Sequence, residues 1–165
     1  MEQNLQGKRV AVLMADGVDN MDYTRTRAFL EEHGARVTLL APDARPGDYD
    51  GLLLAGDTAN GAALRTHAAA IAFIKAFGAA NKPIAAICHG PSMLIDAGLA
   101  NARHLTSAPA LQAALREAGA EWTDDEVVVD DRLITSRSPD DIPAFNDAFM
   151  KELIVAGVTD TGPGA

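Results

Sequence analysis

The chain has 165 residues, of which 48% are hydrophobic and 22% charged, and its formal net charge is −9. This composition predicts one soluble domain with a substantial core, and the negative charge disfavours non-specific binding to nucleic acid or to an anionic membrane. A single cysteine excludes an internal disulfide and a cysteine-cluster metal site. The apolar runs are too short for a secretory signal or a membrane span, so we expect a cytoplasmic protein.

Short β-rich runs alternate with helical patterns in the first half of the chain. We predict strands at 8–14, 36–41 and 51–55, and a helix over 19–32 that closes at His33-Gly34. A further helix is predicted before the stop at 81–83, from the spacing of its apolar residues Leu64, Ala68, Ile71 and Ile74. Alternation of this kind is typical of an α/β domain with a mainly parallel sheet covered on both faces.

The second half of the chain continues the alternation and then departs from it. We predict a strand at 104–106, a helix capped by Ser107, and a hairpin that joins 127–129 to 133–135. The run Ser138-Pro139-Asp140-Asp141 is a helix-start signal, and the last helix buries Phe145, Ala148, Phe149 and Leu153. Residues 1–157 are predicted to form one domain, and residues 158–165 a flexible tail.

The stretch 82–91, KPIAAICHGP, is the part of the chain most suggestive of chemistry. An apolar run ends on Cys88, and His89-Gly90-Pro91 lead into a short helix. Strand, sharp turn and helix form the context of a nucleophile elbow. A thiol at a helix N-terminus beside a histidine is expected to be accessible and to have a lowered pKa. The alternative is that Cys88 is an inert core residue, as most buried cysteines are.

Three predicted turns converge on the same edge of the sheet. In a parallel α/β sheet, ligands bind beyond the carboxyl ends of the strands. Residues 15–17, residues 55–57 and Cys88 all follow predicted strands. This convergence favours a functional Cys88.

The segments AICHGP and TSAPALQAALREAGAEWTDDEVVVDDRLITSRSPDDIPAF resemble the ThiJ/PfpI superfamily, also called the DJ-one superfamily, in its PfpI intracellular-protease branch. The resemblance extends from Lys8 to about Leu153. It implies a flavodoxin-like three-layer sandwich of the class I glutamine amidotransferase type. It also implies a homodimer or larger homo-oligomer and cysteine chemistry without a cofactor. Members are assigned as peptidases, glyoxalases, deglycases, hydratases or stress proteins.

The resemblance assigns roles to individual residues. Cys88 matches the nucleophile, and His89 matches the adjacent histidine of the peptidase-like branch. Asp22 stands where the family usually has a glutamate that hydrogen-bonds the cysteine sulfur. A protonated Asp22 would lower the thiol pKa, whereas an ionised one would raise it. A helix-start acid is the alternative role for Asp22.

The oxyanion pocket implied by the resemblance consists of Gly56, Asp57 and Gly90. Four departures from the family pattern affect the site. Asp57 brings a carboxylate where the family has glycine, which disfavours negative charge nearby. Ala108 replaces an aromatic residue or histidine that lines the pocket. Ala62 replaces the third member of the peptidase triad. The segment 42–49 is too short for the family's extra hairpin.

These residues leave three functions open. The first is a cysteine enzyme that acts on small electrophiles, such as a glyoxalase or deglycase of methylglyoxal-type aldehydes. The second is a PfpI-like peptidase, weakened by Ala62. The third is a stress or redox protein with an oxidisable Cys88 and no turnover. His33, His67 and His104 lack metal-ligand spacing, and we interpret them as structural or solvated.

Overall fold

The computed structural model describes residues 4–13, 21–39, 45–56 and 68–160. A six-stranded sheet with the strand order β2-β1-β3-β4-β8-β7 lies at its centre. The strands are β1 (Arg9–Leu13), β2 (Arg36–Leu39), β3 (Gly51–Gly56), β4 (Ile84–Cys88), β8 (Leu133–Ser136) and β7 (Val127–Asp130). Neighbouring strands are parallel except β7, which pairs antiparallel with β8 as the predicted hairpin.

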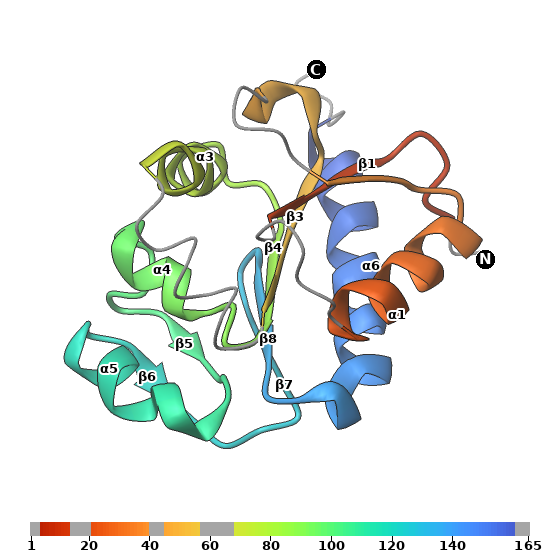
Figure 1. The fold of residues 1–165 in the computed structure, drawn as a ribbon. Coiled ribbons are helices and arrows are strands. Elements are labelled where there is room, and N and C mark those ends of the chain that lie inside the picture. The colour runs from red at the N-terminus through yellow and green to blue at the C-terminus, as the bar shows by residue number, and fades with distance from the viewer. Residues whose placement is uncertain (1–3, 14–20, 40–44, 57–67, 161–165) are drawn as a thin grey trace.

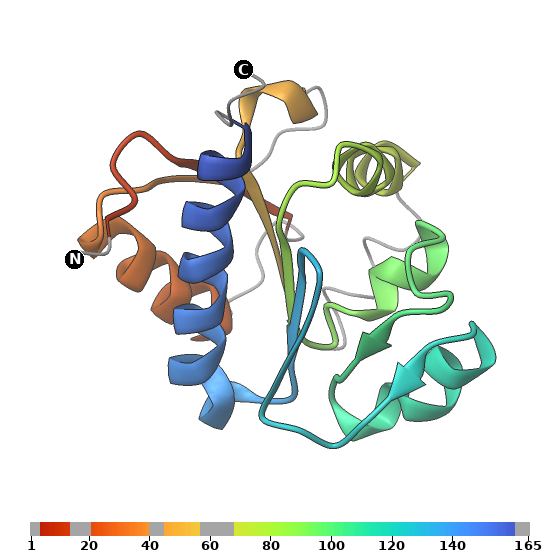
Figure 2. The same cartoon turned by 180° about the vertical axis from the view of Figure 1, so that it is seen from behind.

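Helices cover both faces of this sheet (Figure 1). One face carries α3 (Ala68–Ala79), α4 (Ser92–Asp96) and α5 (Gln112–Glu117), and the other carries α1 (Met21–Glu32) and α6 (Ile142–Asp160). The view from behind shows α1 and α6 side by side (Figure 2). The predicted flavodoxin-like three-layer sandwich is therefore confirmed.

The core has two parts because strand side chains alternate between the faces. Leu52 and Leu54 pack with α3, α4 and α5, whereas Leu53 and Ala55 pack with α1 and α6. All five residues of the central strand β4 are buried. A strand buried on both faces appears in the sequence as an unbroken apolar run, which is why 84–87 was predicted.

A second, two-stranded sheet lies outside the main one. It pairs β5 (His104–Leu105) in parallel with β6 (Glu121–Trp122). The strand predicted at 104–106 therefore does not join the central sheet, and β6 was not predicted. With two residues each, these strands are too short to show a hydrophobic period.

Several local predictions were wrong. The helix predicted before residues 81–83 is present as α3, but of its expected apolar positions among the described residues only Ile74 is fully buried. The other buried residues of α3 are Ala70, Phe73 and Phe77, and the rings of Phe73 and Phe77 stack at 5.2 Å. Ser107 does not act as a cap: its Oγ accepts from Trp122 Nε1 at 2.9 Å and donates to the Ala108 carbonyl. Helix α6 continues to Asp160, so residues 158–160 of the expected tail are helical, and residues 161–165 lie outside the described residues.

The start of the last helix also differs in detail. Pro139–Asp141 forms a 3₁₀ turn before α6, with Pro139 at its first position as predicted. The Asp141 carboxylate accepts from the Arg137 side chain and amide and also from the backbone of Ser138. The Ser138 side chain makes no capping hydrogen bond, so only one half of a capping box is present. Among the described residues, no helix is long and apolar enough to cross a membrane.

Candidate active site

Strand β4 ends on Cys88 in a left-handed backbone conformation. The φ angle of Cys88 is 59°, a value that costs a non-glycine residue about 1–2 kcal/mol. The amide of Gly90 donates to the Ile87 carbonyl at 2.9 Å and closes the turn. Strained backbone of this kind at a strand-to-helix turn is typical of a nucleophile elbow. The elbow predicted from the sequence is therefore present.

Gly90 is required by a close approach of two backbones. A Cβ atom at this position would lie 2.1 Å from the Leu54 carbonyl oxygen of β3. The side chain and amide of Ser92 both donate to the His89 carbonyl, at 2.8 and 3.1 Å. These contacts fix the elbow backbone on both sides of His89.

The segment that follows β5 is hydrogen-bonded to the backbone of the elbow. The amide of Ala108 donates to the Cys88 carbonyl at 2.9 Å. Ala108 itself is buried, at 8% exposure. The residue that departs from the family pattern therefore still contacts the elbow through its backbone.

The predicted convergence of strand ends is confirmed for the described residues. Gly56, the last residue of β3, is the register partner of Cys88. Leu13, the last residue of β1, pairs with Leu54 of β3. Asp22 lies in the first turn of α1, the helix that follows β1. Three other site predictions lie outside the described residues, namely residues 15–17, Asp57 and Ala62.

The thiol is less accessible than the sequence suggested. Cys88 is 9% exposed and packs among apolar residues on the α1 and α6 side of the sheet. Helix α4 has only five residues, so its dipole at the elbow is weaker than that of a long helix.

Two buried hydroxyl groups near the elbow were missed by the sequence analysis. Among the described residues, Thr106 Oγ1 and Ser136 Oγ are buried without a hydrogen-bond partner. Ser136 ends β8 beside Ile87, and the Thr106 amide donates to Thr135 Oγ1 at 3.0 Å. Such groups have no sequence signal, because their surroundings come from residues distant in the chain.

An ion-pair network holds the turn that follows β8. The Arg137 guanidinium contacts both oxygens of the Asp141 carboxylate at 3.0 Å and Asp124 Oδ1 at 2.9 Å. Burial alone would raise the pKa of Asp141, but hydrogen bonds from the Arg137 side chain and amide outweigh it and lower the pKa. This network fixes the turn at the same end of the sheet as Cys88.

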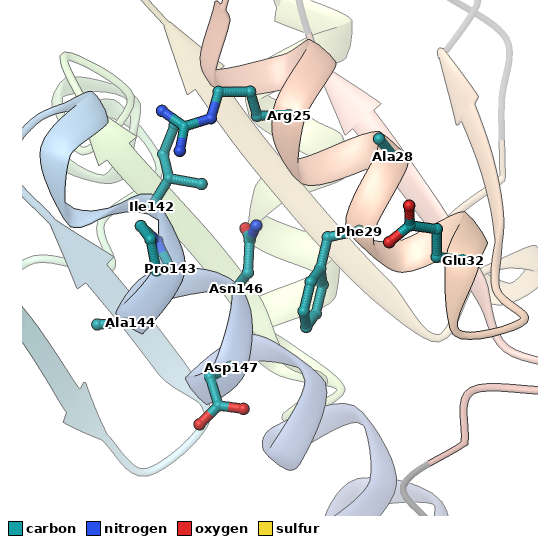
Figure 3. Close-up of a pocket in the computed structure, with 9 residues that line it drawn as sticks. All are labelled: Arg25, Ala28, Phe29, Glu32, Ile142, Pro143, Ala144, Asn146 and Asp147. Atoms are coloured by element: carbon teal, nitrogen blue, oxygen red, sulfur yellow. The ribbon is translucent and has the colours of Figure 1, made fainter.

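A groove between α1 and α6 is distinct from the elbow. It encloses about 550 Å³ and its lining includes Arg25, Phe29, Glu32, Asn146 and Asp147. Asn146 lies at the centre of the groove, between Arg25 and Phe29 (Figure 3). None of the residues predicted for the site lines it.

His33 and His104 make the kind of structural contacts expected for them. His33 packs against the Phe29 ring with a centroid separation of 4.4 Å, and His104 Nε2 lies 2.8 Å from Thr123 Oγ1. His67 lies outside the described residues. Within those residues, no three His, Cys, Asp or Glu side chains form a group that could hold a metal.

Comparison with known proteins identifies the family. The model of the DJ-1/PfpI family matches residues 40–152, which include the elbow, β8 and most of α6. The chain belongs to the DJ-1/PfpI family. The resemblance noted from AICHGP and the 106–145 region is thereby confirmed.

The curated relatives in this family bear different functional names. General stress protein 18 of Bacillus subtilis is 34% identical, with 85% of this chain and 94% of that protein covered. Protein/nucleic acid deglycase 2 of Escherichia coli is 34% identical, with 88% and 98% covered. The provisionally named cysteine protease YraA of B. subtilis is also 34% identical, with 84% and 94% covered.

A solved structure of the family shows the same arrangement. Drosophila melanogaster DJ-1beta is 26% identical, with a TM-score of 0.78 over 88% of this chain and 90% of that one. The family is therefore shown, and the names of its members point to more than one activity.

Proposed function

We propose that this DJ-1/PfpI protein is a cofactor-independent cysteine enzyme that acts on small electrophiles, best represented by methylglyoxal-type aldehydes. The observation that carries the proposal is the strained backbone of Cys88 at the elbow, with φ at 59°. Strain persists where the surrounding structure maintains it, and it concentrates at functional sites. The 34% identity to a protein named as a deglycase supports the same reaction class.

In the proposed reaction, the Cys88 thiolate attacks the aldehyde carbon and forms a hemithioacetal. A base removes the proton from that carbon and returns a proton to the neighbouring carbon, which converts the adduct to a thioester. Water then releases a hydroxy acid and regenerates the thiol. The sequence is an internal redox change and needs no external oxidant.

The proton carriers of this scheme are Asp22 and His89. Amides near Gly56-Asp57 and of His89 would stabilise the oxyanion, and Gly90 shapes the turn. A deglycase reaction differs only in its starting adduct, from which water releases an amine and the hydroxy acid. We propose that the active species is a homodimer or larger homo-oligomer in the cytoplasm.

The test measures hydroxy acid formation from methylglyoxal by wild type and by Cys88→Ala. We expect turnover by wild type and none by the variant above the uncatalysed rate. A second assay presents a pre-formed methylglyoxal adduct of an N-acetylated amino acid, and it separates deglycase from glyoxalase activity. Equal rates with and without the thiol would refute the proposal.

Two alternatives follow from specific features. The adjacent Cys88 and His89, together with the relative named as a cysteine protease, favour a peptidase, and Ala62 opposes it. A base without its orienting group typically loses several orders of magnitude in rate. Cys88-dependent cleavage of casein would support the peptidase.

The small side chain of Ala108 and the relative named as a stress protein favour a role without turnover. In that case Cys88 would be oxidised under peroxide while all three substrate assays stay negative. Intact mass measurement of the oxidised protein identifies this outcome.

A further inference from the structure

A hydrogen bond between two buried polar side chains joins α1 to α6. Thr26 Oγ1 donates to Asn146 Oδ1 at 2.7 Å, across 120 positions of sequence. Thr26 is fully buried and Asn146 is 4% exposed. The distance lies at the optimum for a hydroxyl donor. Neither residue has a role in the elbow itself.

Asn146 lines the groove between α1 and α6, whose lining includes charged residues, and the core on this side of the sheet is apolar. Leu30 of α1 and Phe145 and Phe149 of α6 are fully buried on the same side of the sheet. The hydrogen bond repays most of the desolvation cost of the two groups, so its net gain over an apolar pair of the same shape is small. An apolar contact tolerates sliding, whereas a hydrogen bond permits a narrow range of distance and angle. The pair therefore contributes a fixed register between the two helices.

The register of α1 matters because of what the helix carries. Asp22 lies one turn before Thr26, and the backbone of both residues belongs to the same helix. The two residues are one helical turn, about 5.4 Å, apart along α1. A shift of the helix backbone at Thr26 therefore shifts the backbone of residue 22 by about the same distance. Sub-ångström placement decides whether a side chain can share a proton with a neighbour.

The other partner is connected to the elbow. Helix α6 begins at Ile142, shortly after β8, and Asn146 lies in its second turn. Ser136 of β8 is the register partner of Ile87, which precedes Cys88. The side chain of Asn146 occupies the centre of the groove between the helices (Figure 3). The hydrogen bond thus connects the helix of Asp22 to the part of the sheet that holds Cys88.

We propose that Thr26 and Asn146 are positioning residues whose hydrogen bond sets the first turn of α1, and with it Asp22, relative to Cys88. The proposal rests on the role proposed above for Asp22. It makes the reactivity of the elbow dependent on a contact between two helices. Neither Thr26 nor Asn146 is among the residues to which the proposed reaction assigns a role.

The test is a double-mutant cycle on Cys88 reactivity that requires no turnover. The alkylation rate of this single thiol by iodoacetamide is measured from pH 5 to 10 in wild type, Thr26→Val, Asp22→Ala and the double variant. We expect Thr26→Val to slow alkylation at pH 7 at least about threefold, equal to a rise of roughly half a pH unit in the midpoint. In the Asp22→Ala background, Thr26→Val should add nothing.

Three further variants separate positioning from stability. Thr26→Ser keeps the hydroxyl and loses a methyl group, so it should lower the unfolding midpoint while leaving the alkylation profile unchanged. Asn146→Leu removes the acceptor and should reproduce Thr26→Val, which provides a second test if Thr26→Val does not fold. Thr106→Val is the matched control, because the Thr106 hydroxyl is buried without a partner among the described residues. Its profile should match wild type.

Each remaining outcome overturns the proposal. An unchanged profile in Thr26→Val and Asn146→Leu would reduce the hydrogen bond to a purely structural contact. A change that persists in the Asp22→Ala background would mean that the bond acts by another route. If Asp22→Ala leaves the profile unchanged, the proposed role of Asp22 fails as well. If Asp22→Ala alters it and Thr26→Val does not, only the positioning role fails.

Discussion

The left-handed backbone at Cys88 makes a quantitative prediction about stability. Glycine adopts φ near 59° without the steric cost that any Cβ atom brings, about 1–2 kcal/mol. Cys88→Ala keeps this strain and Cys88→Gly removes it. The comparison of the two variants therefore measures the strain at the elbow without the thiol.

The magnitude follows from a matched control in the same strand. Ala85 is fully buried and packs in the same apolar cluster as Cys88. At an ordinary strand position, replacement of alanine by glycine loses about 0.8 kcal/mol of methyl burial and about 0.5–1 kcal/mol through backbone entropy. We expect Ala85→Gly to cost about 1.5 kcal/mol relative to wild type, from the same two contributions. The same contributions at Cys88 are offset by relief of strain, so Cys88→Gly and Cys88→Ala should differ by less than about 0.5 kcal/mol.

The assay is urea unfolding of the four proteins at one pH and one protein concentration, since association shifts apparent stability. The two alanine-to-glycine differences should disagree by about 1–2 kcal/mol, equal to roughly 2–8 °C in thermal midpoint. The free energy of unfolding lost from Cys88→Ala to Cys88→Gly is compared with the loss from wild type to Ala85→Gly. If the two losses are equal, the elbow stores no strain. The main structural support for the proposed function would then be lost.

Three further predictions concern the surroundings of the elbow. Gly90→Ala should cost at least about 3 kcal/mol and slow Cys88 alkylation, because its Cβ would lie 2.1 Å from the Leu54 carbonyl oxygen; chemical denaturation and the alkylation rate measure both effects. Thr106→Val should be neutral or stabilising by up to about 1 kcal/mol in the same unfolding experiment, because it removes a buried hydroxyl that lacks a described partner. Asp141→Asn should lower the free energy of unfolding by about 2–4 kcal/mol at pH 7, because the Asp141 side chain is 3% exposed and its replacement leaves Arg137 without a buried carboxylate partner. Since the folded pKa of Asp141 is lowered, this difference should persist down to about pH 4 and shrink as the pH falls further through the folded pKa, as unfolding curves against pH will show.

The order and type of the main elements could be predicted because the spacing of apolar residues within each short stretch indicates a strand or a helix. The elbow was also predictable, since an apolar run, a reactive side chain and Gly90-Pro91 are consecutive in the chain. Only the required space at Gly90 had to come from the structure, because it depends on the carbonyl of Leu54 on another strand.

What the sequence could not supply depends on contacts between distant residues. The cap predicted at Ser107 failed because Trp122, fifteen positions later, occupies its hydroxyl. The bond between Thr26 and Asn146 spans 120 positions and has no local signature. The same limit applies to the exposure of Cys88, since its covering residues come from several elements.

The hydrogen bond from the Ala108 amide to the Cys88 carbonyl makes the support of the elbow independent of the side chain at position 108. The elbow uses only the amide of residue 108, so every residue type except proline can provide this contact. The side chain at position 108 is therefore not needed for this contact with the elbow. A lineage could exchange an aromatic residue, a histidine or an alanine here and reshape what enters the site, while the nucleophile keeps its place.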